Sequence, residues 1–117
     1  MNEYVDLDIG QLEGRDFIIG REGHIYVESV TASNRHAVVS VNNGRIYLRD
    51  LDSTNGTYLV KGRRLVPFTE GYVNPLQYIH IGGQRHMILD LLATALDFAA
   101  IDGNTTQIYF YEKAANN

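Results

Sequence analysis

Residues 50–60 read DLDSTNGTYLV, a stretch that combines a turn signal with a dense row of polar side chains. Asn55-Gly56 alone would suffice for a tight β-hairpin, because Asn and Gly best tolerate the positive φ angles of a type I′ turn. Around that pair stand more side chains that donate or accept hydrogen bonds: Asp52, Ser53, Thr54 and Thr57. The stretch predicts a hairpin turn whose extra polar groups either make ordinary loop hydrogen bonds or hold a polar ligand.

Short segments with period-two alternation lie on both sides of this turn. They are rich in Val, Ile and Tyr, as strands are, and turn signals separate them at intervals of about 8–12 residues. Asn42-Asn43-Gly44 has the composition of a second hairpin turn. The pattern predicts an all-β sandwich or barrel with strands in RDFIIGR (15–21), HIYVE (24–28), AVVSV (37–41), RIYLR (45–49), YIHIG (78–82) and RHMILDL (85–91).

The C-terminal part has a different composition. Residues 91–101 are rich in Leu and Ala and predict a short amphipathic helix, which Asp102-Gly103-Asn104 would end. TTQIYFYE (105–112) could form one more strand, and residues 113–117 look like a frayed tail. We therefore expect a β-sandwich over residues 1–92 and an extension over 93–117.

Composition narrows the classes of function. The chain has 117 residues, enough for one domain, and no cysteine, which excludes disulfides and thiolate metal sites. A net charge of −4 argues against a nucleic-acid partner, whereas one or two phosphate groups need only a local basic spot. The sequence shows neither a signal peptide nor a membrane span, so we expect a soluble, cytoplasmic protein without a membrane partner.

Catalytic and metal-binding patterns are missing. The chain lacks a cysteine nucleophile, G-x-S-x-G and a P-loop sequence. Its four histidines do not have the spacing of a zinc helix. His80 and His86 flank Gly82-Gly83, but surface histidines on strands explain them better than a metal does. We expect no enzyme, no metal and no cofactor.

Three loop segments carry side chains suited to an oxyanion. They are Gly20-Arg21 at a strand end, SNRH (33–36) directly before a strand, and STNGT (53–57). Arg21 offers a planar fork of donors, and Ser33 adds a hydroxyl. Asn34, Thr54 and Asn55 could bond to the anion or to a peptide backbone. A phosphate, with three acceptor oxygens, fits such a group.

Gly-Arg, then Ser-x-x-His, then [Ser/Thr]-x-Asn-Gly, all on short strands, strongly resembles the forkhead-associated (FHA) domain. The resemblance runs from about Phe17 to Leu92, although extra residues around Asn74-Pro75 depart from the family pattern. It implies an FHA/SMAD-like fold, a two-sheet antiparallel β-sandwich, that binds phosphothreonine peptides through loops at one end. It also implies an interaction module and not an enzyme.

The resemblance assigns roles by position. Arg21 and Ser33 match the residues that hold the phosphate, and Thr54 matches a position that often helps there. Asn34 matches a position where some members touch the phosphopeptide, and Asn55 the residue that binds the peptide main chain. Structural positions of the family are matched by Gly20, His36 and Gly56.

Two functions stay open: a phosphothreonine-dependent binding module, or a phosphate-independent scaffold within a larger assembly. Scaffolds of this fold usually lose the Arg or the Ser, and this chain keeps both. The partner and the oligomeric state do not follow from the sequence.

Overall fold

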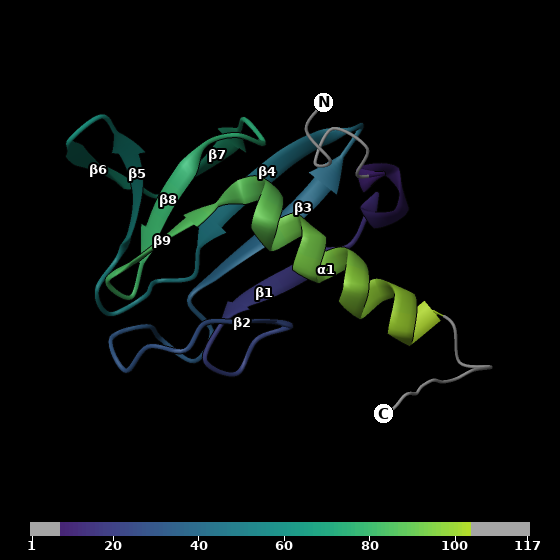
Figure 1. Ribbon diagram of the computed structural model, residues 1–117, viewed down its shortest axis with the longest axis horizontal. Coiled ribbons are helices and arrows are strands. Elements are labelled where there is room, and N and C mark those ends of the chain that lie inside the picture. Colours follow the sequence, from purple (N-terminus) through teal and green to yellow (C-terminus); the bar gives the residue numbers. More distant parts are fainter. Residues whose placement is uncertain (1–7, 104–117) are drawn as a thin grey trace.

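The computed structural model describes residues 8–103 and shows two β-sheets of short strands, a 3-10 helix and an α-helix (Figure 1). Five strands in the order β2-β1-β3-β4-β7 form the first sheet, and four in the order β6-β5-β8-β9 form the second. All pairings are antiparallel except the short one between β1 and β2. The all-β sandwich expected from the sequence is confirmed. The elements are η2 (Ile9–Leu12), β1 (Asp16–Gly20), β2 (Ile25–Tyr26), β3 (Ala37–Asn42), β4 (Arg45–Asp50), β5 (Thr57–Lys61), β6 (Arg64–Phe68), β7 (Glu70–Val73), β8 (Tyr78–Ile81), β9 (Gln84–Met87) and α1 (Ile88–Gly103).

The core lies between the two sheets, and the alternation of the central strands determines which side chains fill it. Along β4, Ile46 and Leu48 are buried while the residues between and beside them are more exposed. Val39 on β3 pairs with Leu48, and it is also fully buried. From the second sheet, Ile79 and Ile81 of β8 point into the same core. The period-two alternation in the sequence of these strands therefore matches the side chains that face the core.

Residues 50–60 do not form a hairpin, contrary to the expectation from Asn55-Gly56. β4 belongs to the first sheet and β5 to the second, so the segment between them crosses the sandwich. Gly56 has a positive φ of 88°, but Asn55 does not, so the two φ angles of a type I′ turn are missing. At the other pair, Asn43 (φ 54°) and Gly44 (φ 73°) do make the expected turn between β3 and β4.

Three strands are missing from the six segments expected from the sequence: β5, which follows the Asn55-Gly56 pair, β6 and β7. β6 and β7 are edge strands, one in each sheet, and neither contains a fully buried residue. β6 contains Pro67, and β7 contains Gly71, residue types that are depleted in strands. The strand expected at residues 24–28 shortens to β2.

The segment RHMILDL is a strand only as far as Met87, where β9 ends. α1 begins at Ile88, so the predicted helix exists but starts three residues earlier than expected. Its first free amides are satisfied, because those of Ile88 and Leu89 donate to the carbonyls of Gln77 and Pro75.

α1 covers part of the first sheet, in front of β1 and β3 in Figure 1. One face of the helix is buried: Ile88, Leu92, Ala95 and Ala99 follow one another at helical spacing.

The domain boundary expected between residues 92 and 93 stays a prediction, and α1 runs across it. The strand expected at 105–112 lies outside the described residues. α1 is the one α-helix of residues 8–103, and it is not long and apolar enough to cross a membrane.

Replacing Leu92 by alanine tests how firmly α1 is packed. The side chain is fully buried, so we expect the free energy of unfolding to fall by about 2–5 kcal/mol, because the truncation leaves a cavity. Thr94→Ala, on the exposed face of the same helix, should change it by less than about 0.5 kcal/mol. Urea denaturation measures both, and equal effects would contradict the packing of α1 on the core.

Candidate functional site

Hydrogen bonds join three loops at one end of the sandwich, at the lower left of Figure 1. The amide of Arg21, after β1, donates to the Ser33 carbonyl oxygen at 3.2 Å. The amide of Thr54, between β4 and β5, donates to Ser33 Oγ at 3.1 Å. Asn55 Nδ2 donates to the Thr31 carbonyl oxygen at 2.8 Å. The three motifs, which are separate in the sequence, thus meet in one place.

The side chain of Arg21 is exposed and anchored at one atom. Its Nε donates to the carbonyl oxygen of Ala32 at 2.8 Å, which fixes the direction of the guanidinium plane. The two terminal nitrogens make no hydrogen bond or ion pair with any residue from 8 to 103. The guanidinium is therefore held in place while most of its donors remain open to an anion.

Ser33 and Asn55 each use only part of their side-chain hydrogen-bonding capacity within the described part of the chain. Ser33 Oγ accepts from Thr54, so the hydroxyl hydrogen is free to be donated to a ligand. Asn55 donates through Nδ2, so its Oδ1 is free to accept an N–H group. The Tyr58 hydroxyl donates to the Asn55 carbonyl oxygen at 3.1 Å, so this hydrogen bond connects the loop to β5. Asn55 is exposed and Ser33 is partly exposed, so a ligand could reach these groups.

Asn34 lies next to Ser33, but no hydrogen bond joins its side chain to the other expected ligand-binding groups. It is exposed and makes no hydrogen bond within the described part of the chain. Its backbone carbonyl oxygen accepts from the Glu22 amide at 2.9 Å. The structure thus fixes the backbone of Asn34 and leaves its side chain to solvent.

His36 is fully buried beneath the loops, and both of its ring nitrogens are hydrogen-bonded. Nδ1 accepts from the Ser33 amide at 3.0 Å, so this nitrogen carries no proton. Nε2 therefore carries the proton and donates to the Gly56 carbonyl oxygen at 2.9 Å. A neutral imidazole thus connects the loop at Ser33 with the loop at Gly56.

Asp50 organises the connection between β4 and β5. Its carboxylate accepts hydrogen bonds from the Ser53 amide at 3.0 Å, the Ser53 hydroxyl at 2.6 Å and the Thr57 hydroxyl at 2.7 Å. Ser53 Oγ in turn accepts from the Gly56 amide at 3.0 Å. Burial acts to raise the pKa of Asp50, but the hydrogen bonds from Ser53 and Thr57 outweigh it, so the pKa lies below its ordinary value.

These contacts decide between the two interpretations of the polar row in residues 52–57. Ser53 and Thr57 make internal loop hydrogen bonds, as one interpretation expected. Asp52 is exposed and takes a left-handed backbone conformation with a φ of 57°. Thr54 and Asn55 remain as the residues of this row that could contact a ligand.

Gly20 and Gly56 allow the loops to approach closely. A Cβ atom on Gly20 would lie 2.3 Å from the Asn34 carbonyl oxygen, a backbone atom that cannot move without shifting the loop. Gly56 has a positive φ of 88°, and a Cβ there would lie 3.1 Å from the Tyr58 hydroxyl. Any larger residue at Gly20 would force apart the segments that carry Arg21 and Ser33.

Sequence reasoning missed two residues that shape this end of the sandwich. Thr31 supplies the carbonyl oxygen that anchors Asn55, and Asp50 supplies the carboxylate under the crossing loop. Neither could have been found from spacing, because a backbone carbonyl is the same in every residue and an Asp before a turn is common.

Within residues 8–103, no three His, Cys, Asp or Glu side chains gather into a possible metal site. His80 and His86 lie on the neighbouring strands β8 and β9 without a third partner of this kind.

Comparison with known proteins defines the family to which this protein belongs. The family model for the FHA domain matches residues 14–82, more than half of the chain, so this protein belongs to the FHA domain family. No curated protein matches the chain. The family and the fold expected from the sequence are thereby confirmed.

Several solved structures share the fold. One, from a study of phosphothreonine-dependent FHA domain interactions, is 26% identical with a TM-score of 0.53, over 60% of this chain and 71% of that one. The FhaA FHA domain, complexed with the intracellular domain of Rv3910, has the same identity and TM-score over 60% and 75%. The FHA-2 domain of the Mycobacterium tuberculosis ABC transporter Rv1747 is 26% identical with a TM-score of 0.51 over 68% of each chain.

The lowered pKa of Asp50 predicts a pH-dependent contribution to stability. The ionised carboxylate stabilises the fold above about pH 4, the ordinary Asp value, and this is lost as the pH falls through the lower folded-state pKa. We expect Asp50→Asn to lower the free energy of unfolding by about 1–3 kcal/mol at pH 7 and by progressively less below about pH 4. Urea denaturation measures this difference.

Asp52→Asn is the matched control, because Asp52 is exposed and Asn also tolerates its left-handed conformation. It should change the free energy of unfolding by less than about 0.5 kcal/mol, both at pH 7 and at pH 3. A cost of Asp50→Asn that stays constant between pH 7 and pH 3 would show that the ionised carboxylate is not what stabilises the loop.

Proposed function

We propose that this protein is a phosphothreonine-dependent interaction module that binds phosphorylated peptides at the three joined loops, and that it is not an enzyme. The observation that carries the proposal is the hydrogen bonding that brings Arg21, Ser33 and Thr54 together at the surface. Membership of the FHA family supports it, as does the phosphothreonine dependence reported for a similar domain.

The proposed mechanism is capture of a dianionic phosphate by fixed donors. The terminal nitrogens of Arg21 and the Ser33 hydroxyl hydrogen would bond to the phosphate oxygens, and the Thr54 hydroxyl, whose residue is exposed, would assist. Charge-assisted hydrogen bonds of this kind contribute about 1.5–3 kcal/mol each. Because the loops already hold these groups, little ordering would be required when a ligand binds.

Asn55 would bind the peptide beside the phosphothreonine. Its free Oδ1 can accept a main-chain N–H, while the bond from Nδ2 to Thr31 keeps the amide group oriented. The exposed side chain of Asn34 would contact the peptide as well. Gly20, His36 and Gly56 would act through the loops and not touch the ligand.

The partner we propose is a phosphorylated protein, since a complex with a protein domain is known for the similar FhaA FHA domain. The methyl group of threonine would favour phosphothreonine over phosphoserine, as the family implies. The cytoplasm is the proposed setting, and the absence of cysteine is compatible with its reducing conditions.

Substitution of Arg21 tests the phosphate contact. We expect Arg21→Ala to weaken binding to a degenerate phosphothreonine peptide library at least about ten-fold, by fluorescence anisotropy, because charge-assisted bonds are lost. Arg21→Lys should restore only part of the affinity, because Lys keeps the charge but lacks the planar fork.

Arg63→Ala, at the exposed turn between β5 and β6, removes the same charge away from the loops and should have little effect. Phosphoserine and unphosphorylated libraries complete the comparison. Equal binding of phosphorylated and unphosphorylated peptides, indifferent to Arg21, would instead support a phosphate-independent scaffold.

The protonation of the ligand gives an independent prediction. The second pKa of a phosphate ester is about 6, so about nine tenths of it is a monoanion at pH 5. We expect affinity to fall up to about ten-fold between pH 7.5 and pH 5, and the decrease should be smaller in Arg21→Ala. Thermal melts at each pH verify that the protein remains folded. A flat affinity profile would contradict a mechanism centred on the phosphate.

A further inference from the structure

A pocket lies at the other end of the sandwich from the three loops. Its volume is ≈ 380 Å³, and it opens beside the β3–β4 turn at Gly44. Asp50, where the crossing loop begins, is at the far end of β4 from this turn, and a strand of that length spans about 20 Å. The pocket is therefore separate from the candidate phosphate site.

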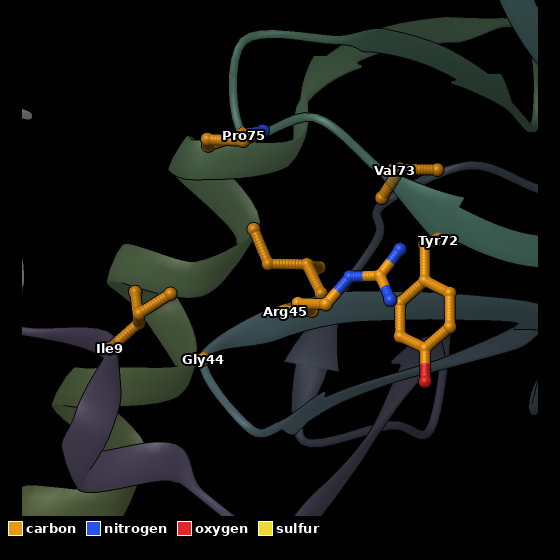
Figure 2. A pocket seen from close by; sticks show the side chains of 7 residues that line it. Ile9, Gly44, Arg45, Tyr72, Val73 and Pro75 are labelled. Atoms are coloured by element: carbon orange, nitrogen blue, oxygen red, sulfur yellow. The ribbon is translucent and has the colours of Figure 1, made fainter.

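The pocket combines apolar walls with one cation. Ile9 from η2, Val73 from β7 and Pro75 from the following turn contribute apolar walls, and the buried Ile46 lines the pocket as well. Figure 2 shows the side chain of Arg45 extended toward the ring of Tyr72. An occupant would therefore meet apolar surface and a guanidinium together.

Arg45 is held in position, and no acidic side chain among residues 8–103 pairs with it. Its guanidinium carbon lies 3.9 Å from the centroid of the Tyr72 ring, a cation–π contact. Tyr72 packs edge-on against Tyr47 with 5.0 Å between centroids, and the Tyr47 hydroxyl donates to Glu70. Within residues 8–103, the Arg45 guanidinium itself makes no hydrogen bond or ion pair. Its donors are thus directed, and no residue from 8 to 103 accepts a hydrogen bond from them.

The surroundings are those of a protein-binding surface. Tyr72 is 48% exposed, and Leu76, which follows Pro75, is 59% exposed. Tyr and Arg beside apolar side chains are the composition of energetically dominant contacts in protein interfaces. Although the chain as a whole carries a net charge of −4, the Arg45 guanidinium has no ionic partner among residues 8–103 and is a local site of attraction for acidic groups.

We propose that this end of the sandwich is a second protein-binding surface, which takes an acidic segment of a partner protein. A carboxylate of the partner pairs with Arg45, and a neighbouring large apolar side chain enters the pocket against Ile46 and Val73. The volume suits one such side chain with part of its backbone, and no phosphate is required.

Two peptide pools and amide NMR spectra of isotope-labelled protein test the proposal. The acidic pool contains acetyl-Gly-Z-Φ-Gly-amide peptides, with Asp or Glu at Z and Leu, Ile or Phe at Φ, and the neutral pool has Asn or Gln at Z. We expect the acidic pool to shift the amides of Gly44, Ile46 and Val73 and to leave those of Ser33 and Thr54 in place. Binding of the neutral pool should be at least about ten-fold weaker.

The matched variants are Arg45→Gln and Arg64→Gln, which remove the same charge from exposed arginines at the pocket and on β6. Binding should weaken at least about ten-fold in Arg45→Gln and stay unchanged in Arg64→Gln. The proposal is overturned if the pocket amides do not shift up to about 5 mM peptide, if both pools bind equally, or if both variants weaken binding equally. The probes carry no phosphate, so the outcome is independent of the phosphothreonine proposal.

Discussion

The buried imidazole of His36 is the interaction on which the loop end of this molecule depends. One ring nitrogen accepts the amide of Ser33, and the other donates to the carbonyl of Gly56, so a single neutral side chain holds two loops together. The His36 backbone carbonyl oxygen also accepts the Leu51 amide, at the start of the crossing segment. An imidazole is suited to this place because its two nitrogens, on opposite sides of a flat ring, can accept and donate at once. Without it, these groups would lose their partners in the interior of the loops.

Local turn chemistry was interpreted correctly at one Asn-Gly pair and wrongly at the other, and the contrast has a physical cause. Asn43-Gly44 joins two strands of one sheet, so its short-range signal agrees with the fold. Asn55-Gly56 ends a segment that crosses between sheets, and Asp50, rather than a type I′ turn, sets its shape. Whether two neighbouring strands pair or separate depends on the packing of the whole sandwich, and a few turn residues do not encode that.

The candidate site could be located from the sequence because its side chains stand in three compact motifs in fixed order. The spacing did not show how the chain holds those side chains in place. Arg21 is anchored by the carbonyl of Ala32, and Asn55 by the carbonyl of Thr31. Backbone groups are invisible to residue-type patterns. The start of α1 was misplaced for a related reason, since the apolar run from Met87 to Leu91 fits a strand or a helix equally well until its packing is known.

The shared bonding of the loops also makes them one unit of local unfolding. The amides of Ser33, Thr54 and Gly56 donate, respectively, to His36, Ser33 and Ser53, so each is protected by a side chain of the same connected set. A fluctuation that releases the ring of His36 removes the acceptor of one amide and loosens the segment that carries the other two. These amides, distant in sequence and near the surface, would therefore exchange their hydrogens with solvent through a common opening instead of fraying one by one.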